Sequence, residues 1–248
     1  MSKWTEHVLR WRDCELCSLC ETRNKVVLLR GQIPCDVLFV GEAPGESEDV
    51  FGKPFYGPAG NLLERMLSDA GWNVADHDIE PVRRAFTNLI GCLPQEEDTE
   101  REGLGSKWKL REPTKEEIKA CAPRLREIVE ITRPRVILLV GRLAENWVPK
   151  ILAGEDTNVK GRSGNRLSGA KTGKGKTGPS TPLSRRDTGG KKAATKKRGE
   201  VPGPNDHYRF ESIIHPAAIL RADISRKALA AQQTVIKLRD IAEDLITL

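Results

Sequence analysis

The sequence lacks any apolar run long enough to cross a bilayer. Its longest apolar runs, such as the five residues Val136 to Val140, fall far short of the roughly 20 residues that a membrane helix needs. The N-terminus, Met1-Ser-Lys-Trp4, also lacks the apolar core of a secretory signal. We therefore expect a protein that stays in the reducing cytoplasm, without a membrane partner. Its six cysteines are then expected to be metal ligands, core residues or reactive thiols rather than disulfides.

Acidic residues are almost absent from one segment. Residues 160–199 hold 13 of the 41 Lys and Arg residues but only Asp187 among the 35 acidic ones. The whole chain carries a net charge of +6, whereas the 28 basic and 34 acidic residues outside this segment leave a net charge of −6. Such a segment predicts a DNA-like polyanionic partner, bound more weakly as salt rises, or else a solvated spacer. The proposed DNA-binding residues within it are Lys191, Lys192, Lys196, Lys197 and Arg198.

Large apolar residues are also scarce in this part of the chain. The stretch from Gly161 to Gly203 consists mostly of Gly, Lys, Arg, Ser, Thr and Pro, so it cannot bury enough surface to offset its conformational entropy. We therefore expect residues 154–206 to form a flexible basic insertion. Residues 1–153 and 207–248 are then expected to form a single domain, which the length of the chain allows.

Elsewhere, short apolar runs alternate with helical patterns. Strands are predicted at 36–41, 85–90, 135–141 and 209–214, helices at 59–71, 114–132, after Gly141 and at 226–246, and a turn-rich loop at 42–49. The alternation predicts a three-layer α/β/α fold with a central, mostly parallel four-stranded sheet. Because sites in such sheets form at the carboxyl ends of the strands, chemistry is expected in the loops after Gly41, Ile90, Gly141 and Ile214.

Two motifs follow the first and last of these strands. The first runs Gly41-Glu-Ala-Pro-Gly-Glu-Ser-Glu-Asp49 and continues to Gly52-Lys-Pro-Phe-Tyr-Gly57, and the second is His215-Pro-Ala-Ala-Ile-Leu220. Together with Thr87-Asn88 and Cys14-Glu-Leu-Cys17, they resemble the family 4, iron–sulfur uracil-DNA glycosylases of the uracil-DNA glycosylase superfamily. A nucleotide-binding turn of another α/β fold is the alternative for the first motif, although neither a dinucleotide fingerprint nor a phosphate loop follows it.

The resemblance implies a DNA-repair enzyme that flips uracil out of DNA and hydrolyses its N-glycosidic bond, leaving an abasic site. Uracil-containing DNA is the implied partner, and we expect a monomer in the cytoplasm of a prokaryotic or phage-infected cell. Two relatives in the superfamily are alternatives: one binds uracil-containing or single-stranded DNA without cutting it, and one bonds covalently to DNA through a histidine in an inserted loop. The predicted insertion has no histidine before His207, which disfavours the covalent alternative.

The resemblance assigns uracil binding to Ala43, Phe55 and Asn88. Phe55 matches the residue on which uracil stacks, and Asn88 matches the residue whose amide reads the O4 and N3–H edge of the base. Ala43 lies in the first motif and is grouped with them. Without the resemblance, Phe55 would be interpreted as a core residue and Asn88 as a strand-end cap.

Catalysis is assigned to His215, Glu42 and Glu48. His215 matches a histidine that stabilises negative charge on the departing uracil, although a lone histidine is usually structural. One of the two glutamates would orient water or stabilise the oxocarbenium-like sugar, and the sequence does not distinguish them. Asp49 is either a third such carboxylate or part of a solvated acidic loop. Ile219 or Leu220 is expected to wedge into the gap left by the flipped base, with helix-core packing as the alternative.

Four cysteines match the ligands of the family's [4Fe–4S] cluster, namely Cys14, Cys17, Cys92 and Cys121. Cys20 continues a C-x-x-C-x-x-C run with the first two, so it is a competing ligand, and a four-cysteine zinc site is the alternative centre. Cys35 has no assigned role. We expect the cluster to be structural, clamping the N-terminal segment onto the domain.

Overall fold

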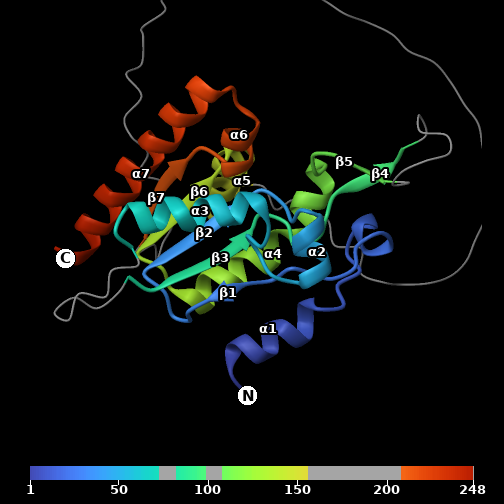
Figure 1. Ribbon diagram of the computed structural model, residues 1–248. Coiled ribbons are helices and arrows are strands. Elements are labelled where there is room, and N and C mark those ends of the chain that lie inside the picture. Colours follow the sequence, from blue (N-terminus) through green and yellow to red (C-terminus); the bar gives the residue numbers. More distant parts are fainter. Residues whose placement is uncertain (73–81, 99–107, 156–207, 248) are drawn as a thin grey trace, which may run out of the picture. The chain divides into compact units, whose positions relative to one another are not determined.

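A five-stranded sheet lies at the centre of the computed structural model, which describes residues 1–72, 82–98, 108–155 and 208–247 (Figure 1). Its strand order is β1 (Arg30–Gly31), β3 (Arg84–Asn88), β2 (Val37–Gly41), β6 (Val136–Val140) and β7 (Arg209–Ile213). The last four strands pair in parallel and correspond to the four predicted strands. The sheet has one strand more than predicted, because β1, which is antiparallel to β3, is too short to give a sequence pattern.

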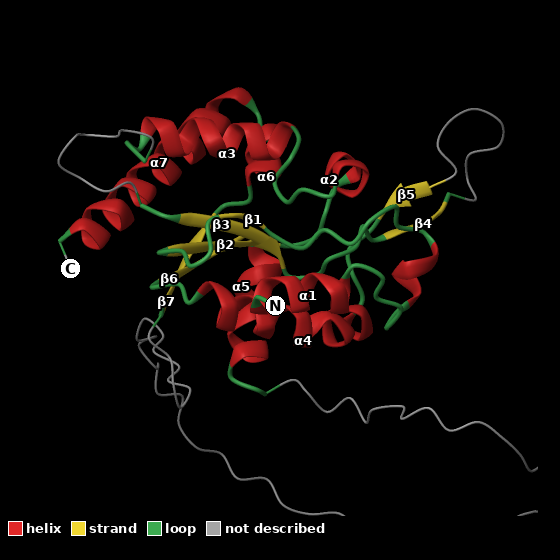
Figure 2. Cartoon of the chain, turned by 90° about the horizontal axis from the view of Figure 1, so that it is seen from below, coloured by secondary structure: helices red, strands yellow, loops and turns green. Residues whose placement is uncertain are grey.

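Helices cover both faces of the sheet (Figure 2). One face carries α3 (Pro58–Asp69), α6 (Pro216–Arg221) and α7 (Ile224–Ile246), and the other carries α4 (Lys115–Thr132) and α5 (Arg142–Leu152). Helix α1 (Lys3–Trp11) packs against α4. The predicted three-layer α/β/α arrangement is therefore confirmed, and within the described ranges no helix is both long and apolar enough to cross a membrane.

The strand sequences explain the two-sided core. All five residues of β2 are buried, as expected for a parallel strand covered on both faces. Successive side chains alternate, so that Val37 and Phe39 pack with α3 and α7 while Leu38 and Val40 pack with α4 and α5.

Helix starts follow ordinary capping rules. The predicted capping box of α4 is present, with the Thr114 hydroxyl accepting from the Glu117 N–H and the Glu117 carboxylate accepting from the Thr114 N–H. Helix α7 starts two residues earlier than predicted, because the Asp223 side chain caps it by accepting from the Arg226 N–H.

The segment 42–49 corrects one prediction. It was expected to be a loop throughout, but Glu46–Phe51 form helix α2. A separate 3₁₀ turn, Ser18–Glu21, lies near the N-terminus. Acidic side chains in the first turn of α2 favour it electrostatically, and Gly52, with φ of 70°, ends it. A second unpredicted feature is the antiparallel pair of β4 (Gln95–Glu97) and β5 (Trp108–Leu110).

The predicted insertion at 154–206 lies outside the described residues except for its first two positions. All five of its proposed DNA-binding residues also lie outside the described residues, namely Lys191, Lys192, Lys196, Lys197 and Arg198. The two-part domain organisation therefore stays a prediction.

Candidate active site and cysteine site

A pocket opens where the parallel strands end. The loops after β2 and β7 contribute to its lining, together with Asn88 at the end of β3, Leu143 in the helix after β6, and the segment from the end of β5 to Pro113. All six residues predicted to bind uracil or to act in catalysis line it, namely Glu42, Ala43, Glu48, Phe55, Asn88 and His215. Sequence reasoning missed the contribution of Leu110 to Pro113, because the hairpin that brings them to the pocket was not predicted.

Gly41 allows the two uracil-binding side chains to meet. It ends β2 directly opposite Asn88 in β3. A Cβ atom on Gly41 would lie 2.3 Å from Asn88 Oδ1 and 2.8 Å from Phe55 Cζ. Because real Cβ contacts are longer than this, only glycine permits this approach of amide and ring.

The backbone holds Phe55 in a restrained position. Its φ of 54° lies in the left-handed region, which is unusual for a residue with a bulky side chain. Its N–H donates to the Glu48 carboxylate, and Gly60 packs so closely that a Cβ there would overlap the Phe55 carbonyl. The ring is 7 % exposed and packs 5.7 Å from the ring of Phe86, measured between centroids. Phe55 is thus both a core residue and a wall of the pocket.

Asn88 is the most deeply buried polar residue in the pocket lining, with 2 % of its surface exposed. Its backbone carbonyl accepts from Arg124. Burial raises the pKa of the Glu48 carboxyl, and the nearby side-chain amide of Asn88 opposes that shift in part. The Nδ2 atom nevertheless has no hydrogen bond of acceptable geometry among the described residues. A buried donor of this kind is costly unless a ligand satisfies it.

Glu48 is enclosed by backbone donors. One oxygen accepts from the Gly45 N–H at 2.6 Å, and the other accepts from the Phe55 N–H. Burial raises the pKa of this carboxyl, and the backbone hydrogen bonds oppose that shift. Both oxygens of Glu48 are therefore used to hold the pocket wall together.

His215 caps helix α6 with its side chain. Its Nδ1 accepts from the Ala217 N–H at 3.1 Å, so the proton of the neutral ring lies on Nε2. Burial lowers the pKa of His215, the Glu42 carboxylate raises it in part, and Arg221 lowers it further. The ring is thus a neutral donor at neutral pH.

Glu42 lies beside this histidine. Its Oε1 accepts from the Leu143 N–H at 3.0 Å. A Cβ atom on Gly141, whose φ is 99°, would lie 2.5 Å from that oxygen and 3.1 Å from His215 Cβ. Glycine at 141 therefore lets the carboxylate and the imidazole approach the same backbone position.

Asp49, Ile219 and Leu220 lie outside the pocket lining. Asp49 is fully buried and accepts from Asn24 and the Lys25 N–H, so it anchors the N-terminal segment and is neither a solvated loop residue nor part of the pocket lining. Ile219 is 1 % exposed and packs in the core, whereas Leu220 is 37 % exposed. Of the two wedge candidates, only Leu220 presents its side chain at the surface.

The cysteines form a second site. Cys14 and Cys17 follow α1, Cys92 follows β3, and Cys121 lies in α4, yet all four line one small cavity. Cys20 does not line it, and Cys35 is buried elsewhere. All six are free thiols. Burial raises the pKa of Cys14 and Cys17, and it raises the pKa of Cys92 to about 12.

The lining of this cavity combines thiols with cations. Among the described residues, no group of three or more His, Cys, Asp or Glu side chains is arranged to hold a metal ion. Two cations, Arg23 and Arg124, also line the cavity and complement the negative charge of a thiolate-ligated group.

Comparison with known proteins agrees with this geometry. The family model of the Uracil DNA glycosylase superfamily matches residues 30–239. The "Type-4 uracil-DNA glycosylase" of Saccharolobus solfataricus is 34% identical over 56% of each chain. That of Archaeoglobus fulgidus is 33% identical over 59% of this chain and 64% of the relative. That of Thermotoga maritima is 33% identical over 65% of this chain and 74% of the relative.

The match spans less than two thirds of the length of the first two of these relatives. The family model, however, covers most of the chain from β1 to α7. On this evidence the chain belongs to the uracil-DNA glycosylase superfamily.

Proposed function

We propose that this protein is a uracil-DNA glycosylase, which flips uracil out of DNA and hydrolyses the bond between the base and the sugar. The observation that carries the proposal is the buried Asn88 Nδ2 without a partner, in a pocket also lined by Phe55 and His215. The names of the type-4 relatives support the same activity.

Asn88 is the specificity residue of the proposal. Its Nδ2 donates to uracil O4 and its Oδ1 accepts from N3–H. Cytosine presents a donor at position 4 and an unprotonated N3, so both contacts would fail and leave buried polar groups unpaired. The Phe55 ring adds stacking, which any base accepts, so it contributes affinity more than selectivity.

His215 stabilises the leaving group. Cleavage breaks the bond between C1′ and the base nitrogen, and the electron pair leaves with uracil. The Nε2–H of the neutral imidazole donates toward O2, where the negative charge develops. The hydrogen bond from Ala217 to Nδ1 keeps the ring in the required tautomer.

Glu42 is the better candidate for orienting water. Both oxygens of Glu48 accept from backbone N–H groups, so Glu48 positions Phe55 instead. Glu42 is half-buried, borders the pocket and lies beside His215. A water held there adds to C1′ and passes its proton to the carboxylate.

Leu220 is the candidate wedge at the gap left by the flipped base. Its side chain is 37 % exposed at the end of α6, next to Arg221, which borders the pocket. An apolar side chain at such an edge can enter a base step that has lost its partner.

We also infer that Cys14, Cys17, Cys92 and Cys121 hold a [4Fe–4S] cluster. When bound, the cluster would supply covalent cross-links between the segment after α1, the segment after β3 and helix α4. Bound in this way, the cluster would add covalent ties to the hydrogen bonds through which Asp49 already anchors the N-terminal segment.

A cleavage assay tests the activity. Anaerobically purified protein is incubated with end-labelled DNA that carries one uracil, either single-stranded or paired with G or A, followed by alkali and a denaturing gel. Cutting only at uracil is expected. Intact DNA from protein with its cluster bound would favour the binding-only relative, and a slowly migrating adduct before alkali would favour the covalent one.

A further inference from the structure

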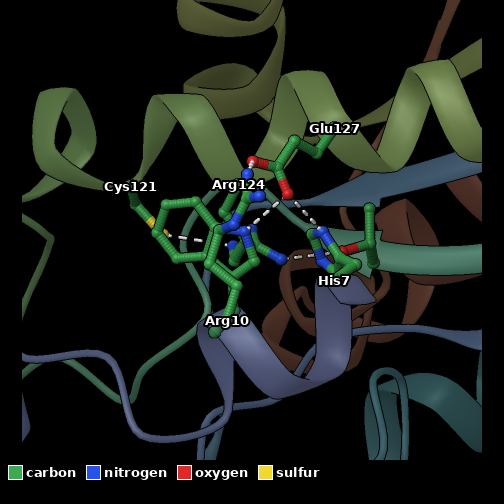
Figure 3. Close-up of polar contacts among 7 residues, drawn as sticks. His7, Arg10, Cys121, Arg124 and Glu127 are labelled. Carbon is green, nitrogen blue, oxygen red and sulfur yellow. Dashed lines mark hydrogen bonds and ion pairs between the residues drawn. The ribbon is translucent and has the colours of Figure 1, made fainter. Parts of the chain in front are cut away.

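Arg124 is a buried cation between the two sites. It lies in α4 one turn after Cys121 (Figure 3). Its side chain is 1 % exposed. Among the described residues it forms no ion pair with a carboxylate. Glu127, one turn further along α4, instead accepts from the side chains of His7, Arg10 and Trp11. Because a buried guanidinium is always charged and costly to desolvate, it needs another anion.

The guanidinium spans from the cysteine cavity to the uracil pocket. On one side, Nε donates to Cys121 Sγ at 3.2 Å. On the other side, Nη2 donates to the backbone carbonyls of Asn88 and of Leu89, the latter at 3.2 Å, and Nη1 donates to Thr87 Oγ1 at 3.3 Å. One planar side chain therefore contacts a predicted cluster ligand and the backbone of the proposed uracil-reading residue.

The chain after β3 connects the same two sites. Asn88 lines the pocket and Cys92, four residues later, lines the cysteine cavity. Between them, the Gly91 N–H donates to Cys121 Sγ at 3.3 Å. A Cβ on Gly91 would lie 3.2 Å from Arg124 Nε and 3.3 Å from its Cδ, so glycine leaves room for the guanidinium.

We propose that Arg124 is a positioning residue that uses the anionic, cluster-bound Cys121 as its counter-charge and thereby fixes Asn88 for uracil recognition. This inference rests on the proposed function. A thiolate bound to a cluster is a strong, fixed acceptor, and the rigid guanidinium transmits its position to the Asn88 carbonyl. The cysteine site then supports base recognition as well as folding.

The test compares holoprotein variants on helix α4. Arg124→Lys keeps the charge but cannot contact Cys121 and Asn88 together. Arg124→Gln removes the charge. The matched control is Arg126→Lys, because Arg126 donates from Nε to the Ile151 carbonyl at 2.9 Å and lines neither site.

Two readouts are needed. The first is the affinity for DNA carrying 2′-fluoro-deoxyuridine, which resists cleavage, relative to undamaged DNA of the same sequence. The second is the midpoint potential of the cluster. Arg124→Lys is expected to lower the uracil preference about ten-fold while leaving the potential near that of the wild type. Arg124→Gln is expected to lower both, because the reduced and more negative cluster loses a buried cation.

The inference is overturned if Arg124→Lys and Arg126→Lys keep the same uracil preference as the wild type. If neither Arg124 variant retains the cluster, Gly91→Ala serves instead. Its Cβ would lie 3.1 Å from Val26 Cγ1 and 3.2 Å from Arg124 Nε, so it crowds the guanidinium by a few tenths of an ångström while keeping its charge. An unchanged uracil preference in that variant would also overturn the inference. Failure of the proposed function is separate, because it appears as a wild-type holoprotein that prefers uracil-containing DNA but does not cut it.

Discussion

At the residue scale, Gly41 constrains two uracil-binding side chains at once, because it contacts both Asn88 and Phe55. We expect Gly41→Ala to displace the amide and the ring, since its Cβ would lie within 3 Å of both. The expected cost is about 1–3 kcal/mol of stability and at least a ten-fold loss of kcat/KM on uracil-containing DNA. Chemical unfolding and single-turnover cleavage measure the two effects, and a fully active Gly41→Ala protein would contradict the described geometry.

The ionisation of His215 gives a second prediction at this scale. Burial lowers its pKa below the ordinary 6.5, and the Glu42 carboxylate opposes that shift by stabilising the imidazolium. Glu42→Gln removes the opposing charge, so the pKa of His215 should fall further. NMR titration of the histidine ring protons, with His215→Gln to assign the signal, measures it. A midpoint above 6.5, or one that rises in Glu42→Gln, would show that the two side chains do not interact as described.

Single residues show how far the sequence could predict the site. The resemblance assigned Phe55, Asn88 and His215 to one site, and all three line one pocket, because motifs at strand ends converge in a parallel sheet. It could not separate Glu42 from Glu48, since that depends on which backbone N–H groups each carboxylate meets. Asp49 was placed wrongly for the same reason, because its partners lie 25 residues earlier in the chain.

At the scale of elements, helix α1 is held by one carboxylate. Glu127 accepts from His7 at 2.9 Å, from Trp11 at 2.8 Å and from Arg10, and Trp11 also lines the cysteine cavity. We expect Glu127→Ala to loosen α1, cost about 1–3 kcal/mol and speed the loss of the cluster to a chelator. The exposed Glu130 on the same helix provides the control variant Glu130→Ala.

Equal rates of cluster loss in Glu127→Ala and wild type would show that α1 does not protect the cysteine site. Visible absorbance of the bound cluster, followed over time with a chelator present, gives the rates directly. Far-UV circular dichroism before chelation confirms that both variants begin folded.

Elements with strong periodicity were predicted well, and short ones were not. The four parallel strands and the long helices follow from apolar runs and capping residues. β1, α2 and the β4–β5 pair have two, six and three residues per element, which is too short for a periodic pattern, and the strands among them form only with partners elsewhere in the chain. The β4–β5 pair matters for function, since Leu110 to Pro113 reach the pocket from it.

At the scale of the whole molecule, charge is concentrated in residues 160–199. Deleting them would change the net charge from +6 to −6. If this segment is a polycationic arm, the deletion should weaken binding to DNA of any sequence and flatten the dependence of affinity on salt. Fluorescence anisotropy at several salt concentrations tests this, and an unchanged salt slope would mean that the segment is only a spacer.

The proposed function depends above all on the buried amide of Asn88, and removing that amide tests whether it reads uracil. kcat/KM is determined on DNA with a single uracil for the wild type, Asn88→Ala and the control Gln233→Ala, an exposed amide on α7. Asn88→Ala is expected to lose about 100-fold in kcat/KM, because the buried Nδ2 that would donate to the base is removed, while the control keeps full activity. Wild-type kcat/KM in Asn88→Ala would show that this amide does not read the base.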